Sequence, residues 1–111
     1  MRPGDIVGVD FGNPIGSEPG FVRPAIVVTA EAVLTRHPRT LHVVPMTSNI
    51  SRAMPTEILV DDASFDRPSA AQCHLCTVIS VERITDPPTK NVGPALLAQI
   101  RSVLADLLDL M

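Results

Sequence analysis

Prolines and glycines divide most of this chain into short apolar runs. Eleven prolines and six glycines are spread over 111 residues, and they separate runs such as "DIVGVDF" (5–11), "RPAIVVTA" (23–30) and "TLHVVPMT" (40–47). Proline interrupts helices and glycine favours turns, so this pattern excludes long helices from most of the sequence. Several short apolar segments between frequent turn signals predict a small β-barrel or β-sandwich.

The remaining segments fit the same interpretation. "TEILV" (56–60) indicates a fourth strand, and "SAAQCHLCTVISV" (69–81) is long enough for one bent strand or two short ones. "EAVLTRH" (31–37) predicts a turn or two of helix that stops at Pro38. The chain has no Trp, no Tyr and three Phe among 45% apolar residues, so its core must be aliphatic. At this length we expect a single domain, residues 1–111.

The C-terminal segment breaks the pattern. "GPALLAQIRSVLADLLDLM" (93–111) has Pro94 at the first helical position and no later interruption, which predicts one long helix. Outside one polar face, the surface of this helix is mostly Leu, Ile and Val. The apolar part is wider than the ~100° stripe that is needed to cover one sheet. Either the barrel wraps more of the helix or part of the helix faces a second subunit. The polar face of this helix is marked by Gln99, Ser102, Asp106 and Asp109.

Charge and targeting signals narrow the class of protein. The net charge of −3 is not that of a typical nucleic-acid binder. Residues 1–52 hold five arginines and four carboxylates, so a polyanion would dock on this half. No run approaches ~18 apolar residues, and the N-terminus lacks the features of a signal peptide. We therefore expect a cytoplasmic protein without membrane contact, with reduced cysteines.

The "CHLC" motif has the two-residue spacing of zinc and thioredoxin-like sites. Zinc needs four ligands, and Cys73 and Cys76 have only His37, His42 and His74 as further ligand candidates. On a strand, residues three apart also point to opposite faces. We therefore expect buried structural cysteines, a surface position for His74, and no metal or other cofactor.

Two polar segments at strand ends are candidates for function. "GSEPGFVRP" (16–24) gathers Ser17, Glu18 and Arg23 in a long loop stiffened by prolines, and "VVPMTSN" (43–49) ends a strand with three polar residues. Each segment alone has an ordinary explanation. The polar end of 43–49 would be a turn, and Arg23 would form a surface ion pair. Loops that are held on a rigid scaffold are nevertheless where binding and catalytic residues concentrate.

These segments also carry a family resemblance. "RPGDIVGVDFGNPIGSEPGFVRPAIVVTAEAV" (2–33) resembles the opening of the MazF/PemK toxin family, with a Gly-Asp-apolar strand, an acidic residue, Gly-Ser-Glu, Arg-Pro and a Val/Ile run. "VVPMTSN" resembles the second signature of that family, and "SVERI" (80–84) with the leucine-rich end fits its C-terminal part. The resemblance implies a small SH3-like β-barrel with a terminal helix, forming a homodimer.

The resemblance also implies an activity. The family consists of toxins of type II toxin–antitoxin systems, which are metal-independent, sequence-selective endoribonucleases. They cleave single-stranded RNA to a 2′,3′-cyclic phosphate and a 5′-hydroxyl, and a cognate antitoxin protein inhibits them. The family's functional positions correspond here to Ser17, Glu18, Arg23 and Thr47. The chain departs from the family pattern at two places. It has Pro19 where family members often have Gln, and it has His74–Thr77 where many members have Glu-Gln-apolar-Arg.

The chemistry of such a cleavage assigns roles to these residues. The planar fork of Arg23 suits the scissile phosphate, and the Thr47 hydroxyl can bond the same group. Glu18 is the carboxylate near them in sequence and is the candidate general base. Phe21 offers a stacking surface for a base, or packs under the loop. The RNA-binding residues that we expect are Ser17, Phe21, Ser48, Asn49 and Arg52.

Two alternative functions fit the same fold. A gyrase-poisoning toxin would bind its protein target through the end helix and the dimer surface, and it would not need Arg23 together with Thr47. A plain SH3-like adaptor would need a groove of exposed aromatic side chains for proline-rich peptides. Three Phe residues without Trp or Tyr make a poor groove of that kind.

Overall fold

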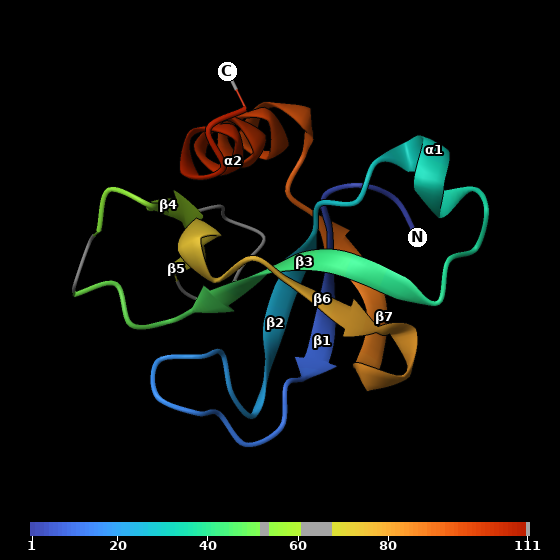
Figure 1. Cartoon of the computed structure of the whole chain (residues 1–111), viewed down its shortest axis with the longest axis horizontal. Coiled ribbons are helices and arrows are strands. Elements are labelled where there is room, and N and C mark those ends of the chain that lie inside the picture. The colour runs from blue at the N-terminus through green and yellow to red at the C-terminus, as the bar shows by residue number, and fades with distance from the viewer. Residues whose placement is uncertain (52–53, 61–67, 111) are drawn as a thin grey trace.

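The protein is an antiparallel sheet with a long helix on one face, as a computed structural model shows for residues 1–51, 54–60 and 68–110 (Figure 1). In chain order the elements are β1 (Asp5–Asp10), β2 (Val22–Val27), α1 (Glu31–Leu34), β3 (Thr40–Thr47), β4 (Glu57–Val60), β5 (Ser69–Gln72), η1 (Cys73–Leu75), β6 (Thr77–Ser80), η2 (Val81–Arg83), β7 (Ile84–Asn91) and α2 (Pro94–Leu107), where η denotes a 3₁₀ turn.

The sheet branches at its longest central strand. Its order is β4-β5-β3-β2-β1-β7, and β6 pairs separately with β3. The first half of β3, residues 40–43, pairs with β6, whereas Met46 and Thr47 pair with β5. Within the described residues no ladder joins the edge strands β7 and β4, so the curved sheet is barrel-like but open. The predicted mainly-β fold with a C-terminal helix is confirmed.

Strands β1, β2 and β3 separate two apolar clusters. On β2, Ala25 and Val27 face one cluster and Ile26 faces the other, because successive side chains of a strand point to opposite faces. Burial on both faces explains the continuous apolar runs of these strands. One cluster contains Val7, Val9, Ala25, Val27, Leu34, Leu41, Val43 and Ile79. The other contains Ile26, Val44, Met46, Val60, Ala71, Cys73 and Ile100.

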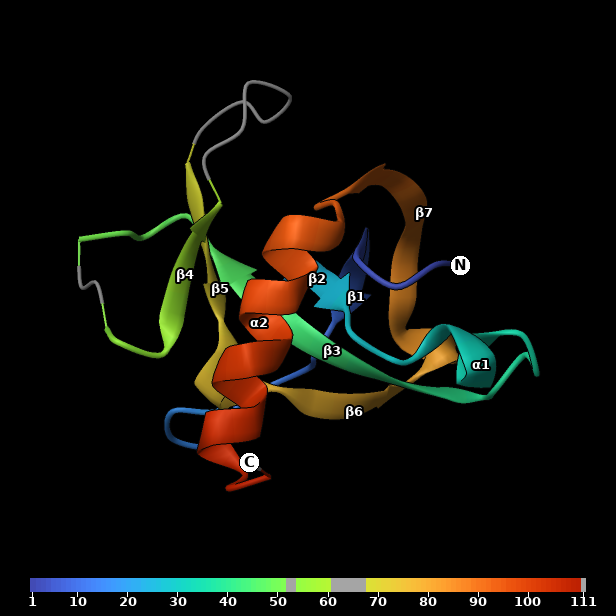
Figure 2. The same ribbon diagram turned by 90° about the horizontal axis from the view of Figure 1, so that it is seen from above.

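Helix α2 covers the second cluster and crosses the sheet (Figure 2). Leu97 and Ile100 are buried, and the predicted polar residues Gln99, Ser102 and Asp106 are exposed. At the C-terminal end of the helix and just after it, apolar side chains are not covered. The exposed fractions there are 43% for Leu107, 66% for Leu108 and 71% for Leu110. In the described part of the chain, no helix is long and apolar enough to cross a membrane.

Two parts of the fold differ from the sequence analysis. The sequence did not predict β7, which contains Pro87 and Pro88. Proline lacks a backbone N–H and is tolerated at sheet edges and irregularities, and β7 is an edge strand whose pairing with β1 has register shifts. The segment 69–81 forms the second alternative, two short strands, because η1 intervenes between β5 and β6.

Candidate active site

The loop between β1 and β2 is closed by backbone hydrogen bonds at its base. The N–H of Phe11 donates to the carbonyl of Phe21 at 2.9 Å, and the N–H of Phe21 donates to the carbonyl of Gly12 at 2.7 Å. Phe21 has a φ of 60°, a left-handed conformation that is uncommon for residues other than glycine. Gly20 is required for space, since a Cβ there would lie 2.5 Å from the ring of Pro14. These contacts fix the way in which the chain enters β2.

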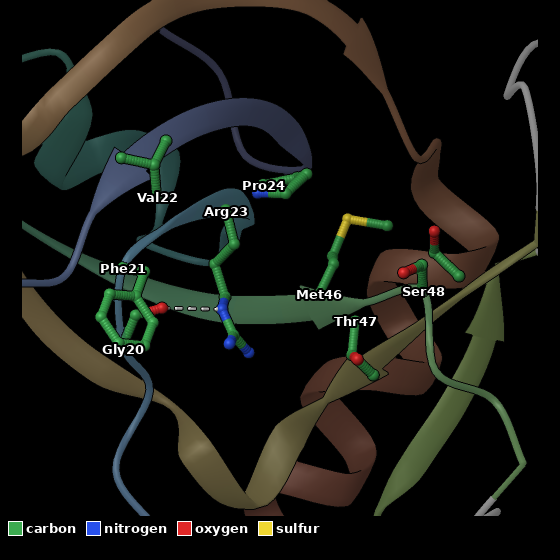
Figure 3. Close-up of a pocket in the computed structure, with 9 residues that line it drawn as sticks. Gly20, Phe21, Val22, Arg23, Pro24, Met46, Thr47 and Ser48 are labelled. Carbon is green, nitrogen blue, oxygen red and sulfur yellow. Dashed lines mark hydrogen bonds between the residues drawn. The ribbon is translucent and has the colours of Figure 1, made fainter. Parts of the chain in front are cut away.

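Arg23 follows this loop in β2, and its side chain points into a cleft (Figure 3). The Nε–H donates to the carbonyl of Gly20 at 3.1 Å, and Nη1 donates to Oε1 of Gln72 at 3.3 Å. A guanidinium has five N–H groups, so three remain for a ligand. The half-buried cation of Arg23 is therefore held in one orientation by two protein acceptors.

The cleft has a volume of about 490 Å³, within the range of small-ligand sites. Thr47, at the end of β3, and Ser69, at the start of β5, also line the cleft and carry hydroxyl groups. A cation and hydroxyls around one cleft are suited to a phosphate group. The cleft is lined by Gly20, Phe21, Val22, Arg23, Pro24, Met46, Thr47, Ser48 and Ser69, and none of these described residues is a carboxylate or an imidazole.

The turn after β3 orients the hydroxyl of Thr47. Its Oγ1 accepts a hydrogen bond from the backbone N–H of Asn49 at 3.1 Å, which directs the hydroxyl hydrogen away from that contact. The side chain of Asn49 is used within the turn, because its Oδ1 accepts from the hydroxyl of Ser51 at 2.6 Å and from the N–H of Ser51 at 3.3 Å. Thr47 thus faces the cleft, whereas Asn49 stabilises the turn.

Glu18 lies outside the cleft that contains Arg23 and Thr47. Its exposed carboxylate accepts from the N–H of Ile15 at 2.8 Å, and its own N–H donates to the carbonyl of Ile15 at 3.2 Å. This reciprocal pair closes a turn within the loop. Glu18 also lines a separate depression of about 190 Å³, beside Phe11 and Arg83.

The structure therefore brings together part of the predicted site. Phe21, Arg23, Thr47 and Ser48 line one cleft. Ser17, Glu18 and Asn49 are exposed and do not line it, and Arg52 lies outside the described residues. Ser69 and Gln72 were not predicted. No local motif marks these two, because they reach the site only through the pairing of β5 with β3.

Comparison with known proteins places the chain in a family. A family model described as the PemK-like, MazF-like toxin of type II toxin–antitoxin systems matches residues 2–108. The chain belongs to this toxin family. The match favours a toxin over the alternative of an SH3-like adaptor.

Two curated relatives of the toxin are named endoribonucleases. Endoribonuclease MazF9 of Mycobacterium tuberculosis is 37% identical over 99% of this chain and 98% of its own length. Endoribonuclease EndoA of Bacillus subtilis is 30% identical over 80% of this chain and 78% of its own length. These relatives give no support to the gyrase-poisoning alternative.

Solved structures agree with the fold. The toxin superposes on MazF (Form-I) from Deinococcus radiodurans with a TM-score of 0.84 and 21% identity, over 98% of this chain and 96% of the other. An endoribonuclease from a mycobacterial species, in complex with its cognate antitoxin, gives a TM-score of 0.78 and 19% identity, over 100% and 97% of the two chains. At this level of identity the likeness shows the fold.

The two cysteines are free thiols below α2 rather than strand residues. Cys73 lies in η1, and the N–H of Cys76 donates to its carbonyl at 3.1 Å. In a 3₁₀ turn, side chains three apart lie on the same side, so the argument from strand geometry was wrong. Burial, with a smaller effect of nearby Cys76, raises the pKa of the Cys73 thiol to about 11, and burial also raises the pKa of Cys76. A raised pKa keeps both thiols protonated at neutral pH, which lowers their reactivity as nucleophiles.

His74, between them, is exposed, as predicted, and its Nδ1 lies 2.9 Å from the hydroxyl of Thr56. Within the described residues, no three His, Cys, Asp or Glu side chains are grouped so as to hold a metal ion.

Proposed function

We propose that this toxin is a metal-independent, sequence-selective endoribonuclease that cleaves single-stranded RNA. The observation that carries the proposal is the position of Arg23, which two protein acceptors hold in the same cleft as the Thr47 hydroxyl. The names of the relatives MazF9 and EndoA support the same activity. In this proposal residues 1–111 form a single toxin domain that acts in the cytoplasm, where its RNA substrate is found.

The RNA supplies its own nucleophile in this reaction. The 2′-oxygen forms a bond to the adjacent phosphorus while the bond from phosphorus to the 5′-oxygen breaks, which gives a 2′,3′-cyclic phosphate and a 5′-hydroxyl. The 2′-hydroxyl loses one proton and the leaving 5′-oxygen gains one, so the overall proton balance is zero. The enzyme must hold the reacting atoms in line and stabilise the charge that develops on the phosphate.

Arg23 and Thr47 are suited to this task. The remaining N–H groups of Arg23 can donate to two phosphate oxygens at once, and the Thr47 hydroxyl can donate to the same group. Because the Arg23 side chain is fixed before the substrate binds, little reorganisation is needed as the charge develops. Phe21 and Ser48 border the cleft and are placed to contact the flanking nucleotide.

The partners follow from the family and from exposed surface. We infer a cognate antitoxin protein, since the family belongs to toxin–antitoxin systems and one similar structure contains its cognate antitoxin. We also infer a homodimer. The uncovered Leu107, Leu108 and Leu110, at the end of α2 and just after it, provide apolar surface that a protein partner would remove from water.

RNA cleavage in the absence of metal is the direct test of this function. Purified toxin should cut a long mixed RNA at selected sites in excess EDTA, because the attacking hydroxyl and the stabilising cation are supplied by the RNA and by Arg23. Mapping of both product ends should find a 5′-hydroxyl and a 2′,3′-cyclic phosphate at each cut. A strict requirement for a divalent ion, or products with a 5′-phosphate, would contradict the proposal.

Glu18→Gln separates the two roles that are open to Glu18. Since the carboxylate lies outside the cleft and bonds the N–H of Ile15, we propose that it organises the loop. The glutamine retains an oxygen acceptor, so cleavage should stay within about twofold of wild type, whereas loss of a general base costs about 10²–10⁴-fold. A loss of the larger size in a folded variant would restore Glu18 as the base.

A further inference from the structure

We propose that Gln72 is a positioning residue for Arg23, which sets the orientation of the guanidinium before RNA binds. This inference rests on the proposed function, because the orientation matters only where a phosphate is bound. Arg23 has two protein acceptors, the carbonyl of Gly20 and the side chain of Gln72. Gly20 belongs to the β1–β2 loop. Gln72 lies outside that loop and accepts from Nη1 at 3.3 Å.

The contact joins two strands that are not neighbours. Arg23 is in β2 and Gln72 ends β5, and β3 lies between them in the sheet. Thr47, at the end of β3, pairs with Ala70 of β5. The hydrogen bond from Arg23 to Gln72 thus passes over the end of β3, where the Thr47 hydroxyl faces the cleft. Gln72 therefore holds Arg23 beside the second group that we assign to the phosphate.

The anchorage of Gln72 is rigid. The preceding Ala71 and the following Cys73 are both buried in the cluster below α2, and the backbone of Gln72 is paired with Glu57 of β4. The backbone at position 72 is therefore fixed, and the half-buried side chain contacts Arg23 from this fixed point.

The chemistry of the pair determines which atoms meet. Arginine has donors and no acceptor, so the amide must turn its oxygen toward Nη1. With Nε donating to Gly20 and one N–H of Nη1 donating to Gln72, the plane of the guanidinium is defined by two points. One N–H of Nη1 and both of Nη2 remain, and together they form a fork that matches two phosphate oxygens.

A neutral acceptor is also the appropriate one. A carboxylate at position 72 would hold Arg23 as well as an amide does, but its negative charge would offset the cation and repel the phosphate. The amide orients Arg23 and leaves its charge for the substrate. This difference gives the experiment two substitutions with opposite expected signatures.

Gln72→Met removes the acceptor at nearly constant volume. We expect kcat to fall about tenfold, the effect of losing one hydrogen bond to a charged group, with a smaller change in KM and an unchanged melting temperature. Gln72→Glu should instead retain the orientation of Arg23 and raise KM. Gln99→Met is the matched control, because Gln99 is exposed on α2 and does not line the cleft; it should cleave as wild type does.

Two further measurements separate positioning from a general structural role. In an Arg23→Lys background, Gln72→Met should cause no more than about a twofold further loss, because the group that it positions is absent. Nitrogen-15 NMR of the toxin without RNA should show restricted rotation about the Arg23 guanidinium, and Gln72→Met should release it.

A near-wild-type kcat in Gln72→Met would overturn the inference. An equal loss of activity in the wild-type and Arg23→Lys backgrounds would also overturn it. So would an Arg23 guanidinium that rotates as fast in wild type as in Gln72→Met. If wild-type toxin fails to cleave any RNA while Gln72→Met still frees the guanidinium, then the proposed function fails and the contact stands.

Discussion

Replacement of Arg23 by lysine should lower kcat/KM for RNA cleavage by about 10²–10³-fold, the size of the loss when one preorganised donor to a developing oxyanion is removed. Lysine keeps the positive charge but has no planar fork, and its single ammonium cannot bond Gly20, Gln72 and two phosphate oxygens at fixed angles. Most of the loss should appear in kcat, because a cation in the cleft still attracts the RNA backbone.

The measurement compares single-turnover rates on one RNA that contains a mapped site. Arg36→Lys is the matched control, since Arg36 is exposed beyond α1 and does not line the cleft. Unfolding curves of both variants should overlay that of wild type. If Arg23→Lys cleaves at nearly the wild-type rate while it folds normally, charge alone is sufficient and the clamp that we assign to Arg23 does not exist.

The sequence predicted the elements whose local pattern matches their environment. The runs that became β1, β2 and β3 are mostly apolar because their middle residues are buried on both faces. Pro94 and the uninterrupted residues after it predicted α2. In contrast, β7 could not be recognised, because Pro87 and Pro88 oppose strand formation locally and are accommodated only by the edge position.

The candidate site was predictable where residues are close to a motif. Arg23 and Thr47 were found through the family resemblance, and they line the same cleft. Glu18 was chosen because it is near Arg23 in sequence, yet the turn at Ile15 engages its carboxylate elsewhere. Gln72 is 49 residues from Arg23. Only strand order brings such a pair together, and local patterns in one sequence do not reveal strand order.

Removal of one 2′-hydroxyl from the substrate should abolish cleavage at that site. If the nucleotide on the 5′ side of the cut is a 2′-deoxynucleotide, the attacking oxygen is absent, and the rate should fall by on the order of 10⁵-fold or more, the advantage of a well-oriented intramolecular nucleophile. Binding should weaken by no more than about fivefold, because at most one hydrogen bond is lost. A competition assay with labelled RNA measures the binding, and product mapping measures the cut.

The control is the same oligonucleotide with the single 2′-deoxynucleotide one position further along, which should still be cut at the original bond. An all-deoxy strand of the same sequence should remain intact. The cleft is lined by polar side chains that can bind and orient a phosphate, namely Arg23, Thr47, Ser48 and Ser69. Our mechanism gives none of them the attacking role. Cleavage of the deoxy-substituted bond would mean that water or a protein hydroxyl attacks phosphorus, and Thr47 and Ser69 would then have to be tested as nucleophiles.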